Sequence, residues 1–180
     1  NLIGGKKVSI EGYFDHESKV LKVTENDNFL RTLVHEYSHF FLLKNDHPSD
    51  MAFRNFKDGN DPYTRTKMWV MKEIEYDEKV KKAFSIIREN EMECEILTVK
   101  HIKNFSLPID ITRYKKCANQ VIFGFHCTEA TRMWEAANPE FYSKEVLSKI
   151  PQNLRRSYIH RLPDSMKFLL QYYEKKEGRK

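Results

Sequence analysis

The sequence predicts a mostly helical α+β domain with a small antiparallel sheet at its N-terminus. Apolar and polar residues alternate only near the start of the chain, whereas most later segments repeat apolar residues at helical spacing. The length of 180 residues, of which 40% are hydrophobic, suits one compact core. We therefore expect a single domain over 1–180, with a main part at 1–105 and a helical C-terminal part of the same domain at 106–180.

The predicted sheet is a short hairpin. Val8 and Ile10 alternate with polar residues, and Leu21 and Val23 do so again after the turn-forming segment 15–18. A small sheet should therefore precede the first helix.

The first helix is predicted by an i, i+3, i+4, i+7 apolar stripe and by a cap at Asn26 or Asp27. Its apolar residues are Leu30, Leu33, Val34, Tyr37 and Phe41. The following segment, 44–66, is rich in Asn, Asp, Gly and Pro, so we expect a long, mobile connection there.

Helical periodicity resumes at about Lys67 and continues to about Lys103, as two helices or one bent helix that ends at Ser106 and Pro108. A further helix, capped by Asp110, is predicted through Phe125. Shorter helices are expected at 128–137, 139–149 and 164–173, and the tail 174–180 should be frayed.

Composition excludes several classes of protein. Lys and Arg exceed Asp and Glu by 31 to 26, but the charges are interspersed, so we expect no nucleic-acid partner. The apolar stretches fall short of the roughly 20 residues that cross a membrane. The three cysteines, Cys94, Cys117 and Cys127, form no closely spaced pair, which favours a reducing, cytoplasmic compartment over a disulfide framework.

The main motif lies in the first predicted helix, where the sequence reads His35-Glu36-Tyr37-Ser38-His39. This is the H-E-x-x-H pattern. Residues i and i+4 share one helical face, so both imidazoles can reach one Zn²⁺ ion. Glu36 would then act as the general base that activates a zinc-bound water.

A catalytic zinc ion needs a third protein ligand. Glu91 is the main candidate because it falls in the middle of an apolar helical stripe, where a carboxylate requires a cation or strong donors. Glu95, one turn later, could hydrogen-bond a ligating histidine and fix its orientation. Glu93, Glu95 and His47 remain alternative ligands. The metzincin pattern is excluded, because Leu42 and Asn45 replace its Gly and His.

Together, the motif at 35–39 and the segment Glu91-Met92-Glu93-Cys94-Glu95 resemble the gluzincin metallopeptidases. In that family, H-E-x-x-H on one helix is completed by E-x-x-x-D on another. The chain is similar to minimal gluzincins of the ImmA/IrrE type and to metallopeptidase-like proteins associated with phage genomes. This resemblance covers about Val8 to Lys103 and implies a zincin-type helix pair with ligands His35, His39 and Glu91. Glu95 departs from the usual Asp.

We therefore expect a zinc-dependent peptidase acting on protein or peptide substrates, in the cytoplasm or, for a phage-encoded chain, the host cytoplasm. Two alternatives are a zinc-binding assembly or regulatory protein with little activity, and a SprT-like DNA-associated protease that uses His47. The strand at 21–24 should border the cleft. The sequence specifies neither the oligomeric state nor the oxyanion-stabilising residue, for which Tyr114, His126, Tyr158 and His160 are candidates.

Overall fold

The computed structural model describes residues 2–3, 6–7, 12–15, 18–56, 59–134, 136 and 138–174. The predicted mostly helical α+β class is confirmed, since two small antiparallel hairpins precede a series of helices. The strands are β1 (Leu2–Ile3), β2 (Lys6–Lys7), β3 (Gly12–Asp15) and β4 (Val20–Val23). The α-helices are α1 (Phe29–Lys44), α2 (Pro48–Arg54), α3 (Pro62–Val70), α4 (Glu78–Asn104), α5 (Ile111–Thr131) and α6 (Lys144–Lys149). Three 3-10 helices are η1 (Pro139–Tyr142), η2 (Arg156–Ile159) and η3 (Asp164–Tyr172).

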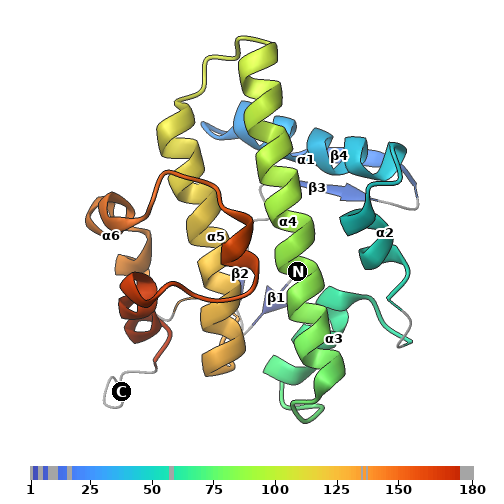
Figure 1. Ribbon diagram of the computed structural model, residues 1–180, viewed down its shortest axis with the longest axis vertical. Coiled ribbons are helices and arrows are strands. Elements are labelled where there is room, and N and C mark those ends of the chain that lie inside the picture. Colours follow the sequence, from blue (N-terminus) through green and yellow to red (C-terminus); the bar gives the residue numbers. More distant parts are fainter. Residues whose placement is uncertain are drawn as a thin grey trace.

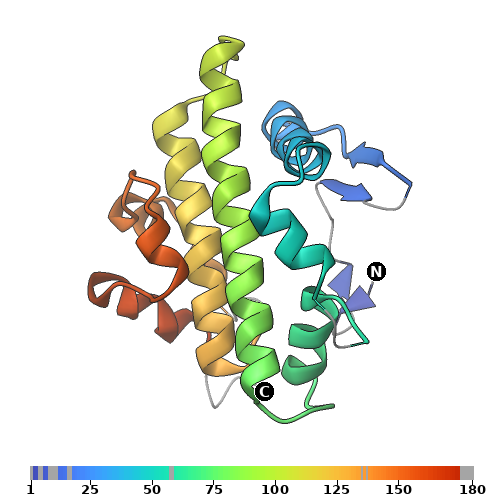
Figure 2. The same cartoon turned by 45° about the vertical axis from the view of Figure 1, so that its right-hand side comes forward.

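The long helix α4 is the centre of the fold (Figure 1). Helix α5 runs beside it, and α1 crosses it with the β3–β4 hairpin on the outer side of α1 (Figure 2). Apolar side chains from all three helices meet where α1 crosses, among them Val34, Ile102 and Tyr114. This crossing brings the motif helix against the Glu91 region of α4.

The C-terminal segments pack on α5 on the side away from α1 (Figure 2). Their core includes Phe123 from α5, Phe141 from η1, Val146 from α6 and Leu169 from η3. None of the helices in the described part of the chain combines the length and the apolar character that a membrane span needs.

Several predicted elements are confirmed. Asp110 caps α5 as predicted, because its side chain accepts a hydrogen bond from the backbone N–H of Arg113. The predicted periodicity from 67 to 103 corresponds to two helices, the end of α3 and most of α4. The hairpin is also present, although its first strand is described at β3, and Val8 and Ile10 lie outside the described residues.

The prediction of a long, mobile connection at 44–66 was wrong. This segment contains α2 and the start of α3, and each helix begins with a proline preceded by a capping residue, His47 or Asp61. Proline at the first helical position costs no hydrogen bond, because that N–H has no partner within the helix. The residues that we interpreted as turn formers are therefore helix starts.

Three smaller predictions also need correction. The N-cap of α1 is Asn28 rather than Asn26 or Asp27, and Asn26 instead accepts hydrogen bonds from the backbone of Asn28 and Phe29. No separate helix occupies the described part of 128–137, because α5 continues to Thr131 and ends at Arg132 in the left-handed conformation. The segment 139–149 is divided between η1 and α6. The tail beyond residue 174 lies outside the described residues.

Candidate metal centre

His35 and His39 lie on the face of α1 that meets α4. Their ring centroids are 4.9 Å apart and the rings are nearly perpendicular. Their side chains are 20% and 12% exposed, so both rings are largely shielded from solvent. This is the arrangement expected from i, i+4 spacing on one helix.

Glu91 projects from α4 between these two rings. One of its carboxylate oxygens lies 3.7 Å from Nε2 of His35, and the other lies 3.7 Å from Nε2 of His39. Glu91 is buried, as its place in the apolar stripe suggested. The structure therefore brings together the three residues that we predicted as ligands.

The spacing of these three groups suits a zinc ion. Bonds of about 2.0–2.1 Å at tetrahedral angles separate two ligand atoms by roughly 3.3–3.5 Å. The 3.7 Å separations are slightly longer and reach different oxygens of Glu91, Oε2 toward His35 and Oε1 toward His39, so the three side chains would have to move closer together to share one ion. Two histidines and one glutamate, with a glutamate base beside them, form a donor set typical of catalytic zinc sites.

The charges of the centre are compatible with a bound cation. Glu36, Glu91 and Glu95 are all buried beside the two histidines. Burial alone would lower the pKa of His39, but Cys94 and Glu91 raise it to about 9. Protons on the imidazoles therefore offset the carboxylates in the protein without metal, and a divalent cation would take over this role.

Glu95 contacts His35 at the ring nitrogen that faces away from Glu91, and we had predicted a contact between Glu95 and a ligating histidine. Its Oε1 lies 3.4 Å from Nδ1 of His35, and Tyr114 on α5 donates a hydrogen bond to its Oε2. Burial raises the pKa of Glu95, but His35 and the Tyr114 hydroxyl lower it below the usual value. A chain of contacts therefore runs from α5 through α4 to α1 and fixes the orientation of the His35 ring.

Tyr63 makes a second contact to Glu91 that sequence reasoning missed. Its hydroxyl donates to Oε1 of Glu91 at 2.5 Å from the first turn of α3. Burial and the neighbouring Glu91 raise the pKa of Tyr63 well above its usual value, so the hydroxyl stays a donor. The only sequence signal was the Asp61-Pro62 helix start, which would have placed Tyr63 on a helix.

Glu36, the predicted general base, is held between α1 and strand β3. Its carboxylate accepts a hydrogen bond from the backbone N–H of Phe14. Burial raises the pKa of Glu36, and the positive charges of His35 and His39 oppose this shift without cancelling it. An upward shift of the carboxylate pKa is the direction that favours general base catalysis.

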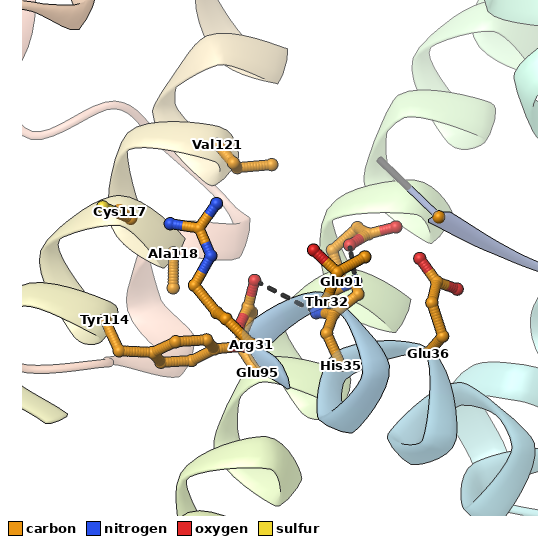
Figure 3. A pocket seen from close by; sticks show the side chains of 11 residues that line it. Arg31, Thr32, His35, Glu36, Glu91, Glu95, Tyr114, Cys117, Ala118 and Val121 are labelled. Carbon is orange, nitrogen blue, oxygen red and sulfur yellow. Dashed lines mark hydrogen bonds and ion pairs between the residues drawn. The ribbon is translucent and has the colours of Figure 1, made fainter. Parts of the chain in front are cut away.

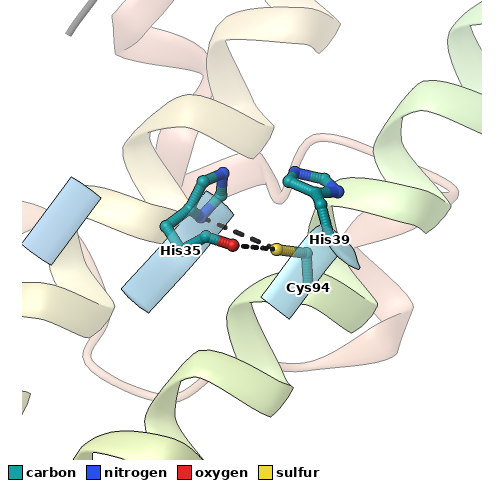
Figure 4. A group of neighbouring side chains, drawn as sticks. All are labelled: His35, His39 and Cys94. Carbon is teal, nitrogen blue, oxygen red and sulfur yellow. Dashed lines mark hydrogen bonds between the residues drawn. The ribbon is translucent and has the colours of Figure 1, made fainter. Parts of the chain in front are cut away.

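Cys94 offers an alternative ligand. Its thiol is fully buried, and one donor atom from each of His35, His39 and Cys94 lies within 4.8 Å of the others (Figure 4). However, the Cys94 Sγ donates to the backbone oxygen of His35 at 3.3 Å and lies 3.7 Å from Nδ1 of its ring. That nitrogen already faces Glu95, whereas Nε2 faces Glu91. The geometry on the Nε2 side therefore favours Glu91.

The other predicted ligands lie in different surroundings. His47 caps α2, where its ring contacts the backbone and hydroxyl of Ser49. Glu93 forms an ion pair with Arg156. Both line a separate cavity together with Phe41 and Lys100, and neither belongs to the group around His35 and His39.

A cleft of about 220 Å³ opens beside the candidate metal centre (Figure 3). Gly12 of β3 lines it, so β3 borders the cleft, whereas we had expected the strand at 21–24. Among the oxyanion candidates named above, Tyr114 alone belongs to the described lining of the cleft. His126 is engaged elsewhere, with its Nε2 2.7 Å from the backbone oxygen of Tyr158.

Comparisons with protein-family models, with curated proteins and with solved structures found no match. The interpretation of the site therefore depends on its residues and their geometry.

Proposed function

We propose that the protein is a zinc-dependent peptidase in which His35, His39 and Glu91 hold the ion and Glu36 is the general base. The observation that supports this proposal most is the position of Glu91. Its Oε2 lies 3.7 Å from Nε2 of His35, and its Oε1 lies 3.7 Å from Nε2 of His39. Glu91 comes from a different helix than the histidines, so local sequence spacing does not produce this convergence.

When bound, zinc would supply a Lewis acid that polarises a peptide carbonyl and acidifies a water molecule. Glu36 would take the proton of that water, and its raised pKa allows it to return the proton to the departing amine. Glu95 and Tyr63 would hold His35 and Glu91 in place through the contacts described above. The three carboxylates in these roles, Glu36, Glu91 and Glu95, are buried, which supports the proposal.

One observation favours a second candidate, a zinc-binding protein without peptidase activity. If the buried Cys94 joined His35, His39 and Glu91, four protein ligands would fill the tetrahedral coordination sphere, as in structural zinc sites. Glu36 weighs against this candidate, because a structural site has no need of a base. The SprT-like alternative has no such support, since His47 serves as a helix cap.

The test measures zinc content by elemental analysis together with hydrolysis of an unfolded protein such as casein. We expect Glu36→Gln to retain one equivalent of zinc and to lose activity by about 100-fold or more, because an amide cannot accept the proton. Glu89→Gln, on the exposed side of α4, is the matched control and should keep both properties.

His35→Ala and His39→Ala should each bind far less than one equivalent of zinc. Full activity of Glu36→Gln would remove the proposed base. Stoichiometric zinc with no hydrolysis by the unmodified protein would favour the structural candidate.

A further inference from the structure

The cleft beside the candidate metal centre has two different walls. On one side lie Glu36 and His35 of α1 with Glu91 of α4, and on the other lies the α5 surface formed by Ala118 and Val121. Its volume of about 220 Å³ is below the roughly 300–1,000 Å³ of pockets that enclose a drug-sized ligand. The cleft therefore suits a short extended stretch of chain with one side chain inserted.

Arg31 reaches into this cleft. Figure 3 shows its side chain extending from α1 toward Val121 of α5. Of the described residues that line the cleft, Arg31 is the only lysine or arginine. It precedes His35 by four residues on the same helical face, which places the two side chains about 5–6 Å apart at Cβ.

The lining of the cleft therefore contains side chains of both charges. The three carboxylates Glu36, Glu91 and Glu95 gather at the metal end, where a bound cation and the histidines would offset them. The guanidinium of Arg31 adds a positive charge to the lining of the cleft. The apolar side chains of Ala118 and Val121 also line the cleft.

The spacing determines which part of a substrate meets Arg31. An extended peptide advances about 3.3 Å per residue, so a group one or two residues from the cleaved bond lies opposite the guanidinium. The planar fork of arginine matches the two oxygens of one carboxylate.

Resting on the peptidase function proposed above, we infer that Arg31 makes the cleft selective for peptides with a carboxylate one or two residues from the cleaved bond. The carboxylate belongs either to an Asp or Glu side chain or to the C-terminus of the peptide.

The test compares zinc-loaded variants on matched short peptides. The peptides carry Glu or Gln at each position near one bond, and each is made with a free and an amidated C-terminus. For the unmodified protein we expect kcat/KM to be about 10- to 100-fold higher with the carboxylate present, the usual effect of a hydrogen bond to a charged group. A preference for Glu over Gln identifies the side chain as the source, and a preference for the free C-terminus identifies the terminal carboxylate.

The Arg31 variants should change this preference without changing zinc content. Arg31→Gln should abolish it, Arg31→Lys should keep part of it, and Arg31→Glu should favour peptides with Lys at the same position. Lys44→Gln, on the exposed end of the same helix, is the control and should behave as the unmodified protein does.

Equal rates on Glu and Gln peptides and on both C-terminal forms would overturn the role of Arg31 and leave the peptidase function standing. An unchanged preference in Arg31→Gln, with zinc and melting temperature intact, would also overturn it. Failure of the zinc-loaded unmodified protein to cleave any peptide would overturn the peptidase function and this inference together.

Discussion

His35 uses its two ring nitrogens for different contacts. Nε2 faces Glu91 at 3.7 Å, and Nδ1 faces Glu95 at 3.4 Å. When Nδ1 carries the proton and donates toward Glu95, the lone pair of Nε2 is directed at the position between the helices. A single side chain thus connects the ligand set to the supporting carboxylate and, through Tyr114, to α5.

Zinc binding should depend on pH, because the imidazoles bind protons in the metal-free protein. Cys94 and the nearby carboxylates raise the pKa of His35 well above its usual value and that of His39 to about 9, although burial lowers both. Below that pH the metal must displace protons, so its apparent affinity increases as pH rises. Between pH 6 and 8 we expect a gain of about 10- to 100-fold per pH unit, measured by chelator competition. An affinity independent of pH would contradict this charge balance.

The residues of the candidate site were predictable only where spacing along one helix reveals them. His35, Glu36 and His39 form a local motif, and Glu91 was identifiable as a carboxylate within an apolar stripe. Tyr63 and Cys94 could not be assigned in the same way. The contact of Tyr63 with Glu91 spans two helices, and the thiol of Cys94 reads in the sequence as one more apolar residue of the α4 stripe.

At the scale of elements, the β3–β4 hairpin approaches α1 closely at Gly12. A Cβ atom there would lie 2.6 Å from Cγ2 of Thr32 and 3.0 Å from the backbone oxygen of Lys22. Any larger residue at position 12 would therefore collide with these two neighbours. Because Phe14 of the same strand donates to Glu36, the fit of the hairpin also sets the position of the general base.

Gly12→Ala should therefore destabilise the protein by about 1–3 kcal/mol, the usual cost of overpacking, and lower activity as β3 moves away from α1. Thr32→Ser removes the methyl group that Cβ would meet and keeps the hydroxyl. In the double variant we expect part of the lost free energy of unfolding to return. Denaturant unfolding of the two single variants and the double variant measures this coupling. Strictly additive effects would show that the close approach to Thr32 is not the cause.

Helices α2 and α3 show why the segment after the motif helix was misinterpreted. Pro48 and Pro62 stand at the first positions of these helices, and His47 and Asp61 accept hydrogen bonds from backbone N–H groups in their first turns. The same residue types are frequent in turns, so composition alone does not distinguish the two structures. Both segments pack against α4, and this packing stabilises their helical structure over a turn.

At the scale of the whole molecule, two arginine–glutamate pairs connect α4 to the later part of the chain. Arg88 is buried, pairs with Glu129 of α5 at 2.6 Å and donates to the backbone oxygen of Ile159. Arg156 of η2 pairs with Glu93 in a more exposed position. The two arginines differ in burial, with side chains 6% and 67% exposed, and only Arg88 makes the additional hydrogen bond to Ile159.

Arg88→Met should destabilise the protein by roughly 3–5 kcal/mol, because it leaves Glu129 partly buried without its charge partner. Arg156→Met should cost no more than about 1 kcal/mol, because the Arg156 side chain is 67% exposed and Glu93, although only 11% exposed, lines a cavity that water can enter once the guanidinium is removed. Chemical unfolding measures both, and zinc content per folded chain should stay unchanged. Equal losses in the two variants would contradict the role that we give to burial.

The central claim is that zinc is bound by His35, His39 and Glu91 without a sulfur ligand. X-ray absorption at the zinc edge tests it most directly, because zinc–sulfur bonds of about 2.3 Å are resolved from zinc–nitrogen and zinc–oxygen bonds of about 2.0–2.2 Å. For protein loaded with one equivalent of zinc, we predict two imidazoles, oxygen ligands and no sulfur. The same spectrum is expected for Cys94→Ser, and a changed spectrum with lost zinc for Glu91→Ala. A sulfur ligand that disappears in Cys94→Ser, with zinc retained in Glu91→Ala, would contradict the assignment.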